Sequence, residues 1–301
     1  MRIVSTLASL VLALGLAAPV HAALEVLACE PEWAALVREI AGDQARVASA
    51  TTPSQDPHRI EARPSLIARA RNADLLVCTG AELEAGWLPL LQRESGNARI
   101  LPGSAGHFEA ADFVELMDKP QRVDRDMGDV HAAGNPHLHL DPGNVARVAD
   151  ALATRLARLD AANAAHYAAR NRDFQNRWRE AMQGWRVRAA PLKGVPLATH
   201  HKDWVYLARW LGMRVETTLE PKPGIEPSAA HLAEVLRRSR ERPVRLILHT
   251  NYQSPRASRW LEEKTGAPAV RLPHTVGATP RATDLIAWMD EVVETLLAAL
   301  K

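Results

Sequence analysis

The sequence predicts an α/β protein of two lobes. Each lobe is expected to hold a four-stranded, mostly parallel sheet covered by helices, and one long rigid helix is expected to join the lobes. Three observations predict this class. Short apolar runs alternate with helical patterns in both halves of the chain, and an unbroken helical pattern at 161–188 separates the halves. The 301-residue chain is also long enough for two domains of ordinary size.

Residues 1–22, MRIVSTLASLVLALGLAAPVHA, are predicted to be a signal peptide outside the fold. The segment carries one early positive charge, Arg2, followed by an apolar run. It ends in the small-x-small sequence Val20-His21-Ala22, so we expect cleavage after Ala22. The alternative is a membrane anchor, although the apolar run is short for a spanning helix. The remaining chain of about 279 residues (301 minus 22) has no other long apolar run, so we expect no membrane insertion of the mature chain.

The amino-terminal lobe is predicted over residues 23–160. Its first predicted helix has typical start and stop signals, because it begins at Pro31 and ends at Gly42. Strands that alternate with helices favour a parallel sheet covered on both faces. The expected strands are 24–29, 45–51, 74–80 and 98–103, and the expected helices are 31–42, 63–72, 82–96 and 144–159.

A linking helix is predicted over residues 161–189. Apolar side chains recur on one face, and only Gly184, which a helix tolerates, interrupts the pattern. A helix over 161–188 would be about 42 Å long at 1.5 Å per residue, a length that suits a strut between lobes. The alternative is a long helix packed within one domain. The apolar face consists of Tyr167, Phe174, Trp178, Met182 and Trp185.

The carboxy-terminal lobe is predicted over residues 190–301, where the same alternation resumes. Pro opens one of its helices, and Ser254 before Pro255 is expected to cap another. The two halves repeat an architecture of about four βα units each, without matching residues. The expected strands are 195–200, 214–220, 244–250 and 268–273, and the expected helices are 202–212, 227–241, 254–266 and 281–301.

Charge and cysteine content restrict the function. Loss of Arg2 with the signal peptide changes the formal charge from +2 to +1, which gives no electrostatic case for nucleic acid or membrane binding. Export permits disulfides, and the two cysteines, Cys29 and Cys78, could form one. Two buried free thiols are an equally open interpretation.

Histidines follow three predicted strands and one polar loop, and these are the candidate metal ligands. Ligands bind open parallel sheets beyond the carboxyl ends of the strands, and imidazole is the commonest metal-ligating side chain. Two candidates fall in each half, which fits a metal held between two lobes. A single loop histidine is usually only solvated, so the grouping carries the prediction. The candidates are His58, His137, His201 and His274.

Two of these histidines have close neighbours that compete for the same role. On an extended segment His137 and His139 would point to the same side, so both could reach one metal. His200 and His201 would point to opposite faces of a strand, so only one should reach a shared site.

Four segments of the chain resemble the metal-specific periplasmic solute-binding proteins of ABC importers, the zinc and manganese group. DPHRIEARPS is similar to the family's first ligand segment, in which Pro follows His by six residues, and GNPHLHLDP is similar to the second, Asn-x-His-x-Trp-x-Asp/Ser-Pro. HHKDWVYLARWLGM resembles the third, in which His precedes Tyr by five residues. Counting back from Tyr206 selects His201 over His200. LPHTVGAT is similar to the last segment, with His274 where many members have Asp.

The resemblance implies a fold of two α/β lobes joined by a rigid helix, with a metal in the cleft. It implies a periplasmic monomer that captures the ion and delivers it to an inner-membrane ABC permease. The chain departs from the family pattern at His139, where Trp is usual, and at His274, where a carboxylate is usual. We expect His139 to line the cleft or hold a ligand in place. The long histidine-rich loop of many zinc members is missing, and His131 in GDVH (128–131) is its only counterpart.

The donor types favour zinc as the ion. Four imidazoles suit tetrahedral Zn²⁺, whereas Mn²⁺ prefers carboxylate and water ligands, so Mn²⁺ is the less favoured alternative. Carboxylates should hold the histidines through their other ring nitrogens, with Glu61, Asp141 and Asp203 as candidates by sequence proximity.

Two other functions compete with metal capture. A secreted zinc hydrolase would use His137 and His139 as ligands, a carboxylate such as Glu61 as the base, and an open position for water. A sugar or amino-acid binding protein would carry incidental histidines and aromatic platforms in its cleft. The tryptophans of this chain fall mostly in helical patterns, where core packing is expected.

Overall fold

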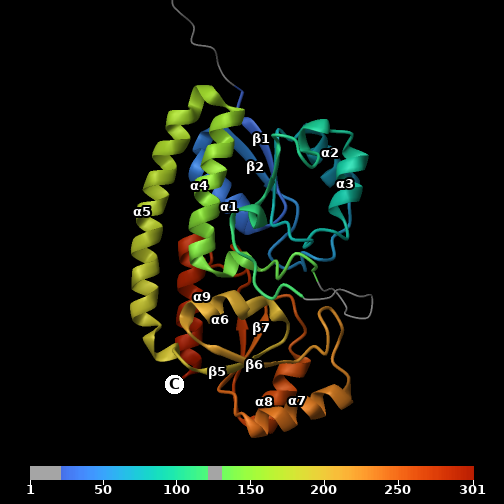
Figure 1. The fold of residues 1–301 in the computed structure, drawn as a ribbon, viewed down its shortest axis with the longest axis vertical. Helices are drawn as coiled ribbons and strands as arrows, with labels where there is room; N and C mark the ends of the chain where they lie inside the picture. Colours follow the sequence, from blue (N-terminus) through green and yellow to red (C-terminus); the bar gives the residue numbers. More distant parts are fainter. Residues whose placement is uncertain (1–21, 121–130) are drawn as a thin grey trace, which may run out of the picture.

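Two four-stranded sheets, one in each lobe, form the framework of the protein (Figure 1). We describe them from a computed structural model over residues 22–120 and 131–301. The predicted signal peptide therefore lies, apart from Ala22, outside the described residues. Every strand pair in the two sheets is parallel, which confirms the predicted fold class.

Both sheets share one topology. In each lobe the first strand of the sequence lies inside the sheet, with the second strand at one edge and the fourth at the other. The amino-terminal order is β2-β1-β3-β4 and the carboxy-terminal order is β6-β5-β7-β8. The strands are β1 (Leu24–Ala28), β2 (Ala45–Ser49), β3 (Leu75–Cys78), β4 (His107–Glu109), β5 (Pro196–Thr199), β6 (Arg214–Thr218), β7 (Leu246–Thr250) and β8 (Ala269–Leu272).

Helices cover both sheets, and most begin close to the start signals in the sequence. Asp284 accepts hydrogen bonds from the N–H groups of Ile286 and Ala287, so the last helix starts a few residues later than predicted. The α-helices are α1 (Pro31–Ala41), α2 (Pro64–Asn72), α3 (Leu88–Ser95), α4 (Pro142–Leu159), α5 (Ala164–Arg188), α6 (Val205–Leu211), α7 (Ala229–Glu241), α8 (Arg256–Thr265) and α9 (Leu285–Ala299).

The predicted strand at 98–103 is wrong. Residues Ala98–Ile100 form a 3-10 turn, because the Asn97 side chain accepts a hydrogen bond from the Arg99 N–H. The fourth strand comes later, directly after Gly106, where a side chain would collide with the carbonyl oxygen of Asp74. The helix predicted at 82–96 is also too long, since turns precede α3 and only Leu88–Ser95 is α-helical.

Helix α5 runs along the length of the molecule and contacts both lobes (Figure 1). It packs on α4 and α1 of the amino-terminal lobe and on α9 of the carboxy-terminal lobe. The indole N–H of Trp178 donates to the Pro142 carbonyl at 2.8 Å, and that of Trp185 donates to Asp290 of α9 at 2.7 Å. One hydrophobic cluster extends through these helices from the first sheet to the second. The predicted linking helix thus packs against both lobes.

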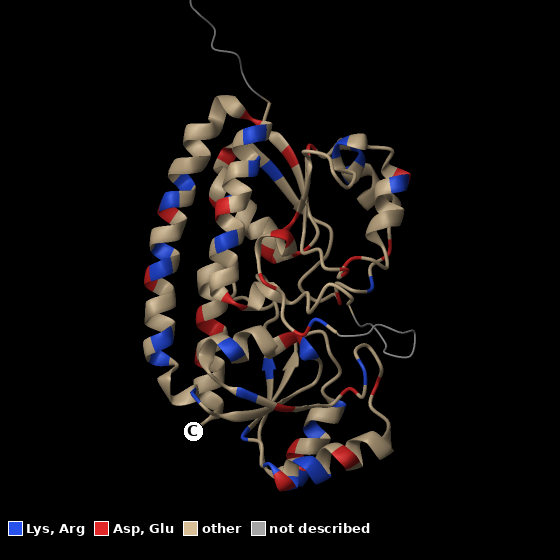
Figure 2. Ribbon diagram, in the orientation of Figure 1, with Lys and Arg blue, Asp and Glu red and all other residues tan. Residues whose placement is uncertain are grey.

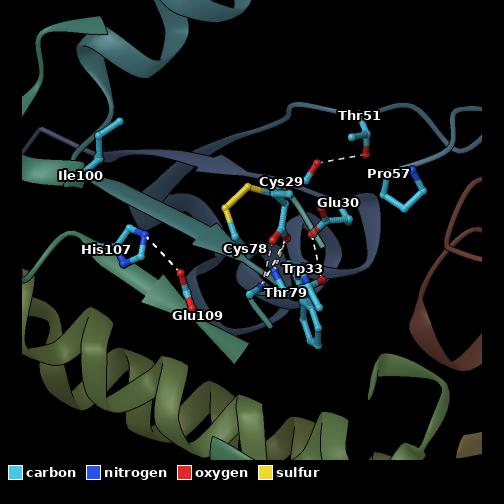
Figure 3. The surroundings of a disulfide bond; sticks show 12 residues. Cys29, Glu30, Trp33, Thr51, Pro57, Cys78, Thr79, Ile100, His107 and Glu109 are labelled. Carbon is cyan, nitrogen blue, oxygen red and sulfur yellow. Dashed lines mark hydrogen bonds and ion pairs between the residues drawn. A yellow bond between two sulfur atoms is a disulfide. The ribbon is translucent and has the colours of Figure 1, made fainter. Parts of the chain in front are cut away.

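Cys29 and Cys78 form a disulfide, which decides between the two alternatives left open by the sequence (Figure 3). The cysteines follow and end the neighbouring parallel strands β1 and β3, and both are fully buried. Glu30 and Thr79, the next residues along each strand, lie beside the bridge, and the Thr79 hydroxyl donates to Glu30 at 3.0 Å. The bridge therefore fixes the carboxyl ends of β1 and β3, the edge of the sheet where ligands are expected.

Charged side chains of both signs are interspersed along the helices, as Figure 2 shows for α5. This mixture agrees with the near-neutral formal charge and offers no single-signed face along that helix. Within residues 22–120 and 131–301, no helix combines the length and apolar character needed to cross a membrane.

Candidate metal centre

Three of the four predicted histidines meet between the lobes. His58 comes from the loop between β2 and α2, His137 from the segment before α4, and His201 from the carboxyl end of β5. One ring nitrogen from each lies within 4.8 Å of the others, so the three could share a single ion. The three rings approach one another nearly edge to face, with centroid separations of 5.2–5.7 Å.

His137 is the most deeply buried of the group. Its side chain is inaccessible to solvent, and neither ring nitrogen has a hydrogen-bond partner. Burial, together with the four surrounding histidines, holds the pKa of His137 well below its ordinary value, so the imidazole is neutral near pH 7. Asn135 fixes its backbone, since the amide oxygen accepts the His137 N–H at 3.0 Å and the amide nitrogen donates to the Lys202 carbonyl at 2.7 Å.

His58 is oriented by Asp56. The carboxylate lies 2.8 Å from Nδ1 of His58 and also accepts the backbone N–H of that residue at 3.0 Å. Because a carboxylate only accepts, Nδ1 carries the proton and the lone pair belongs to Nε2. That Nε2 is buried without a hydrogen-bond partner. Burial opposes the charge on Asp56, but the hydrogen bond and charge of His58 lower the pKa of Asp56 overall.

His201 is oriented in the same way by Glu220. Its Nδ1 donates to the Glu220 carboxylate at 2.7 Å, which leaves Nε2 as the nitrogen with a lone pair. Burial alone would lower the pKa of His201, but the Glu220 bond and the charges of Asp203, Glu220 and Asp56 raise it. The neighbouring His200 is excluded from the three-nitrogen group, and its Nε2 lies 3.8 Å from Glu220. The choice of His201 over His200 therefore agrees with the geometry.

His274 lies beside the three histidines rather than among them. It follows β8, and its ring centroid is 5.5 Å from that of His137 and 4.8 Å from that of His139. Its Nε2 is buried without a hydrogen-bond partner. Burial and the nearby histidines hold its pKa well below the ordinary value, so this imidazole is also neutral at pH 7. It is an available nitrogen donor adjacent to the group of three.

Two further histidines border the cluster. His139 is almost fully buried against Trp288, with the two rings stacked 5.9 Å apart. Its Nε2 lies 3.2 Å from the His274 carbonyl oxygen, so this nitrogen donates a proton and cannot ligate a metal. His131 stacks on His58 at 5.4 Å. The rest of the GDVH segment, residues 128–130, lies outside the described residues.

The carboxylates expected to orient the histidines were wrongly predicted. Glu61 is exposed, Asp141 caps α4 by accepting the Gly143 N–H, and Asp203 accepts from Gln253. Asp56 and Glu220 take the role instead. Asp56 was close in sequence to His58 and could have been found, whereas Glu220 follows β6, the sheet neighbour of β5, which only the strand order reveals.

A cavity of about 180 Å³ opens beside the cluster. Its lining includes His58 and His201, the carboxylates of Asp56, Glu220 and Glu226, and one guanidinium, that of Arg59. The carboxylates outnumber the guanidinium, which favours the approach of a cation over that of an anion.

The comparisons with known proteins agree with this geometry. The family described as "ZnuA: Zinc-uptake complex component A periplasmic" matches residues 26–299, which is most of the chain. The chain therefore belongs to this family, the metal-specific periplasmic solute-binding proteins of ABC importers, and the predicted resemblance is confirmed. Because the family binds metals for transport, the expectation that the chain is not an enzyme is also confirmed.

Individual relatives are distant in sequence but similar throughout. The high-affinity zinc uptake system protein ZnuA of Bacillus subtilis is 24% identical over 268 residues, covering 88% of this chain and 82% of the relative. A crystal structure of ZnuA is 23% identical, covers 93% of this chain and 100% of its own, and superposes with a TM-score of 0.76. The solute-binding protein FpvC of Pseudomonas aeruginosa, solved with Mn²⁺, is 23% identical with a TM-score of 0.76, covering 92% and 98%. At these identities the structures show the shared fold.

Proposed function

We propose that this protein captures Zn²⁺ in the periplasm at a site made by His58, His137, His201 and His274 and delivers it to an inner-membrane ABC permease. The lobes at 23–160 and 190–301 would each supply two ligands, and the helix at 161–189 would hold the lobes together. The mature chain would act as a monomer after removal of residues 1–22.

The single observation that carries the proposal is the state of the four imidazoles. His137 has two buried ring nitrogens without hydrogen-bond partners, and Nε2 of both His58 and His274 is likewise buried and unpartnered. Carboxylates hold Nδ1 of His58 and of His201, so their Nε2 atoms carry lone pairs. Burying unpaired polar nitrogens costs free energy, and a bound cation would offset that cost.

The donor set supports zinc as the cargo. Four imidazoles match the tetrahedral preference of Zn²⁺, while Mn²⁺ prefers oxygen ligands and a higher coordination number. The Bacillus subtilis relative is named for zinc uptake, whereas FpvC was solved with Mn²⁺. The nitrogen donors of the proposed site support zinc over manganese as the cargo.

The proposed site explains why the protein would bind a metal without turning over a substrate. A hydrolase needs three protein ligands and an open coordination position for water. A fourth imidazole from His274 closes that position. Because the ligands come from both lobes, metal binding would favour the arrangement of the lobes in which all four histidines reach the ion. The surface that the permease contacts would then depend on whether the ion is bound.

The proposal is tested by equilibrium titration of the metal-stripped mature protein with Zn²⁺ and Mn²⁺. Wild type should bind one zinc ion, and excess Mn²⁺ should fail to displace it. His137→Ala should weaken zinc binding by more than the about 10–100-fold that loss of an outer hydrogen-bond partner costs. His231→Ala, on α7 outside the cluster, is the matched control and should bind zinc as wild type does. Equal loss in both variants, or displacement by Mn²⁺, would contradict the proposal.

A further inference from the structure

The backbone around His274 is attached to the amino-terminal lobe, although the residue belongs to the carboxy-terminal lobe. His274 follows β8 in a segment without helix or strand hydrogen bonding of its own. Three side chains hold this segment, and two of them come from the other lobe. The position of the fourth imidazole is thus decided by contacts between lobes.

His139 holds the carbonyl group of His274. Its Nε2 donates to that oxygen at 3.2 Å, and the two rings are 4.8 Å apart at an interplanar angle of 76°. Trp288 stacks on the His139 ring, and the side chain is almost fully buried, so the ring has little freedom to rotate. The remaining nitrogen, Nδ1, is buried without a hydrogen-bond partner and lies 3.6 Å from the Glu32 carboxylate. The bond from Nε2 to the His274 carbonyl favours a positioning role for His139.

Glu32 holds the next residue along the chain. Its carboxylate accepts a hydrogen bond from the Thr275 hydroxyl at 2.5 Å, and both side chains are buried. Glu32 lies in the first turn of α1, so the bond joins the start of that helix to the loop after β8. A buried hydrogen bond to a carboxylate is stronger than one between neutral groups.

Asn251 holds the other side of His274. Its amide oxygen accepts the His274 N–H at 3.0 Å, and its amide nitrogen donates to the Pro53 carbonyl at 2.7 Å. Pro53 belongs to the same loop as His58. The backbone of His274 is therefore fixed at its N–H, at its carbonyl and at the following residue, while Nε2 is unpartnered.

We propose that Glu32, His139 and Thr275 form an inter-lobe clamp that positions His274 as the fourth zinc ligand. The inference rests on the proposed function, because it assigns a role to residues that surround the proposed site. The clamp residues are positioning residues that act on zinc only through His274.

Substitutions that remove one bond of the clamp test its role. Thr275→Val removes the hydroxyl with little change in shape, and Thr275→Ser keeps it. His139→Leu removes the donor to His274, and His139→Gln keeps an amide N–H in its place. We expect Thr275→Val and His139→Leu each to weaken zinc binding by about 10–100-fold, with near wild-type binding in the Ser and Gln variants.

Cobalt replaces zinc as a reporter of coordination. The visible absorption of bound Co²⁺ is intense in a tetrahedral site and weakens when the coordination number rises. His274→Ala defines the spectrum of the site without its fourth imidazole. Thr275→Val and His139→Leu should shift the Co²⁺ spectrum toward that of His274→Ala. A loss of zinc affinity with an unchanged wild-type spectrum would overturn the clamp, since a general weakening of the fold would not alter coordination.

A double-mutant cycle separates the clamp from the site itself. In the His274→Ala background, His139→Leu should cause no further loss of zinc affinity, because its effect passes through the removed ligand. The same loss in both backgrounds would overturn the clamp and leave the four-histidine site standing. If His274→Ala alone does not change zinc affinity, the proposed fourth ligand fails, and the clamp fails with it. Far-UV circular dichroism of each variant verifies that the comparison is between folded proteins.

Discussion

Removal of the Cys29–Cys78 bridge should cost about 4 kcal/mol of the free energy of unfolding. The cysteines are 49 residues apart, so the bond closes a loop of about 50 residues in the unfolded chain. The chain-entropy relation gives about 14 cal/mol/K for such a loop, or about 4 kcal/mol at 25 °C. The loop contains α1, β2, α2 and β3, so these elements of the amino-terminal lobe lose the constraint.

Urea unfolding of oxidised and reduced protein measures this difference. The cysteines are inaccessible in the folded state, so reduction is carried out in urea and the protein is refolded under reductant. Reduced wild type keeps the same side chains and lacks only the bond. The Cys29→Ala/Cys78→Ala variant should be insensitive to reductant and serves as the control. A difference below about 1 kcal/mol between oxidised and reduced wild type would refute the loop-entropy reasoning.

Three further predictions follow from the structure. Burial raises the pKa of Glu84 to about 7 from an ordinary value of 4.5, so between these pH values the folded state binds a proton that the unfolded state releases. The contribution of Glu84 to the free energy of unfolding is therefore fully present below pH 4.5 and is lost as the pH rises through 7. Because Glu84 shares its buried site with Glu30, urea midpoints should fall more steeply with rising pH in wild type than in Glu84→Gln, and parallel pH curves would contradict the raised pKa. Asp56→Asn and Glu220→Gln should each weaken zinc binding by about 10–100-fold in isothermal titration, with Asp173→Asn on the exposed side of α5 as the unaffected control. Tyr206→Phe leaves the Asn135 carbonyl and the Met117 N–H without their partner, so the free energy of unfolding measured in urea should fall by about 2 kcal/mol. A change within about 0.5 kcal/mol, the usual effect of a surface substitution, would contradict a stabilising role for the Tyr206 hydroxyl.

The alternation of strands and helices was predictable because buried parallel strands need continuous apolar runs. β3 and β7 are buried along their whole length, and all of β3 and the first three residues of β7 are apolar. The fourth strand of the first lobe was missed for the opposite reason. β4 has three residues, which are too few for a periodic pattern. The apolar run at Ile100 forms a 3-10 turn instead of a strand, because Asn97 accepts the Arg99 N–H and the Gln92 amide donates to the Ile100 carbonyl.

Two of the candidate histidines could be predicted from their place in a βα unit. His201 and His274 directly follow predicted strands, and the rule for open parallel sheets brings strand ends together. Their partners depend on which strands are neighbours. Glu220 reaches His201 only because β6 lies beside β5, and Cys29 reaches Cys78 only because β1 lies beside β3. Sequence order alone contains neither adjacency.

The contacts between lobes were the least predictable feature. Glu32 and Thr275 are 243 residues apart, and no periodicity relates them. His139 resembled a ligand because it alternates with His137, yet residues Leu138–Leu140 form a 3-10 turn rather than an extended strand. The turn sends the two side chains in different directions, so His137 enters the cluster while His139 reaches the His274 carbonyl.

Zinc K-edge X-ray absorption of the one-to-one zinc complex tests the central claim most directly. The account predicts four nitrogen neighbours at about 2.0–2.1 Å, with the outer-shell scattering of four imidazole rings. His274→Ala should lose one imidazole from that pattern. Three imidazoles with an oxygen neighbour in the wild-type protein would contradict the closed four-histidine site.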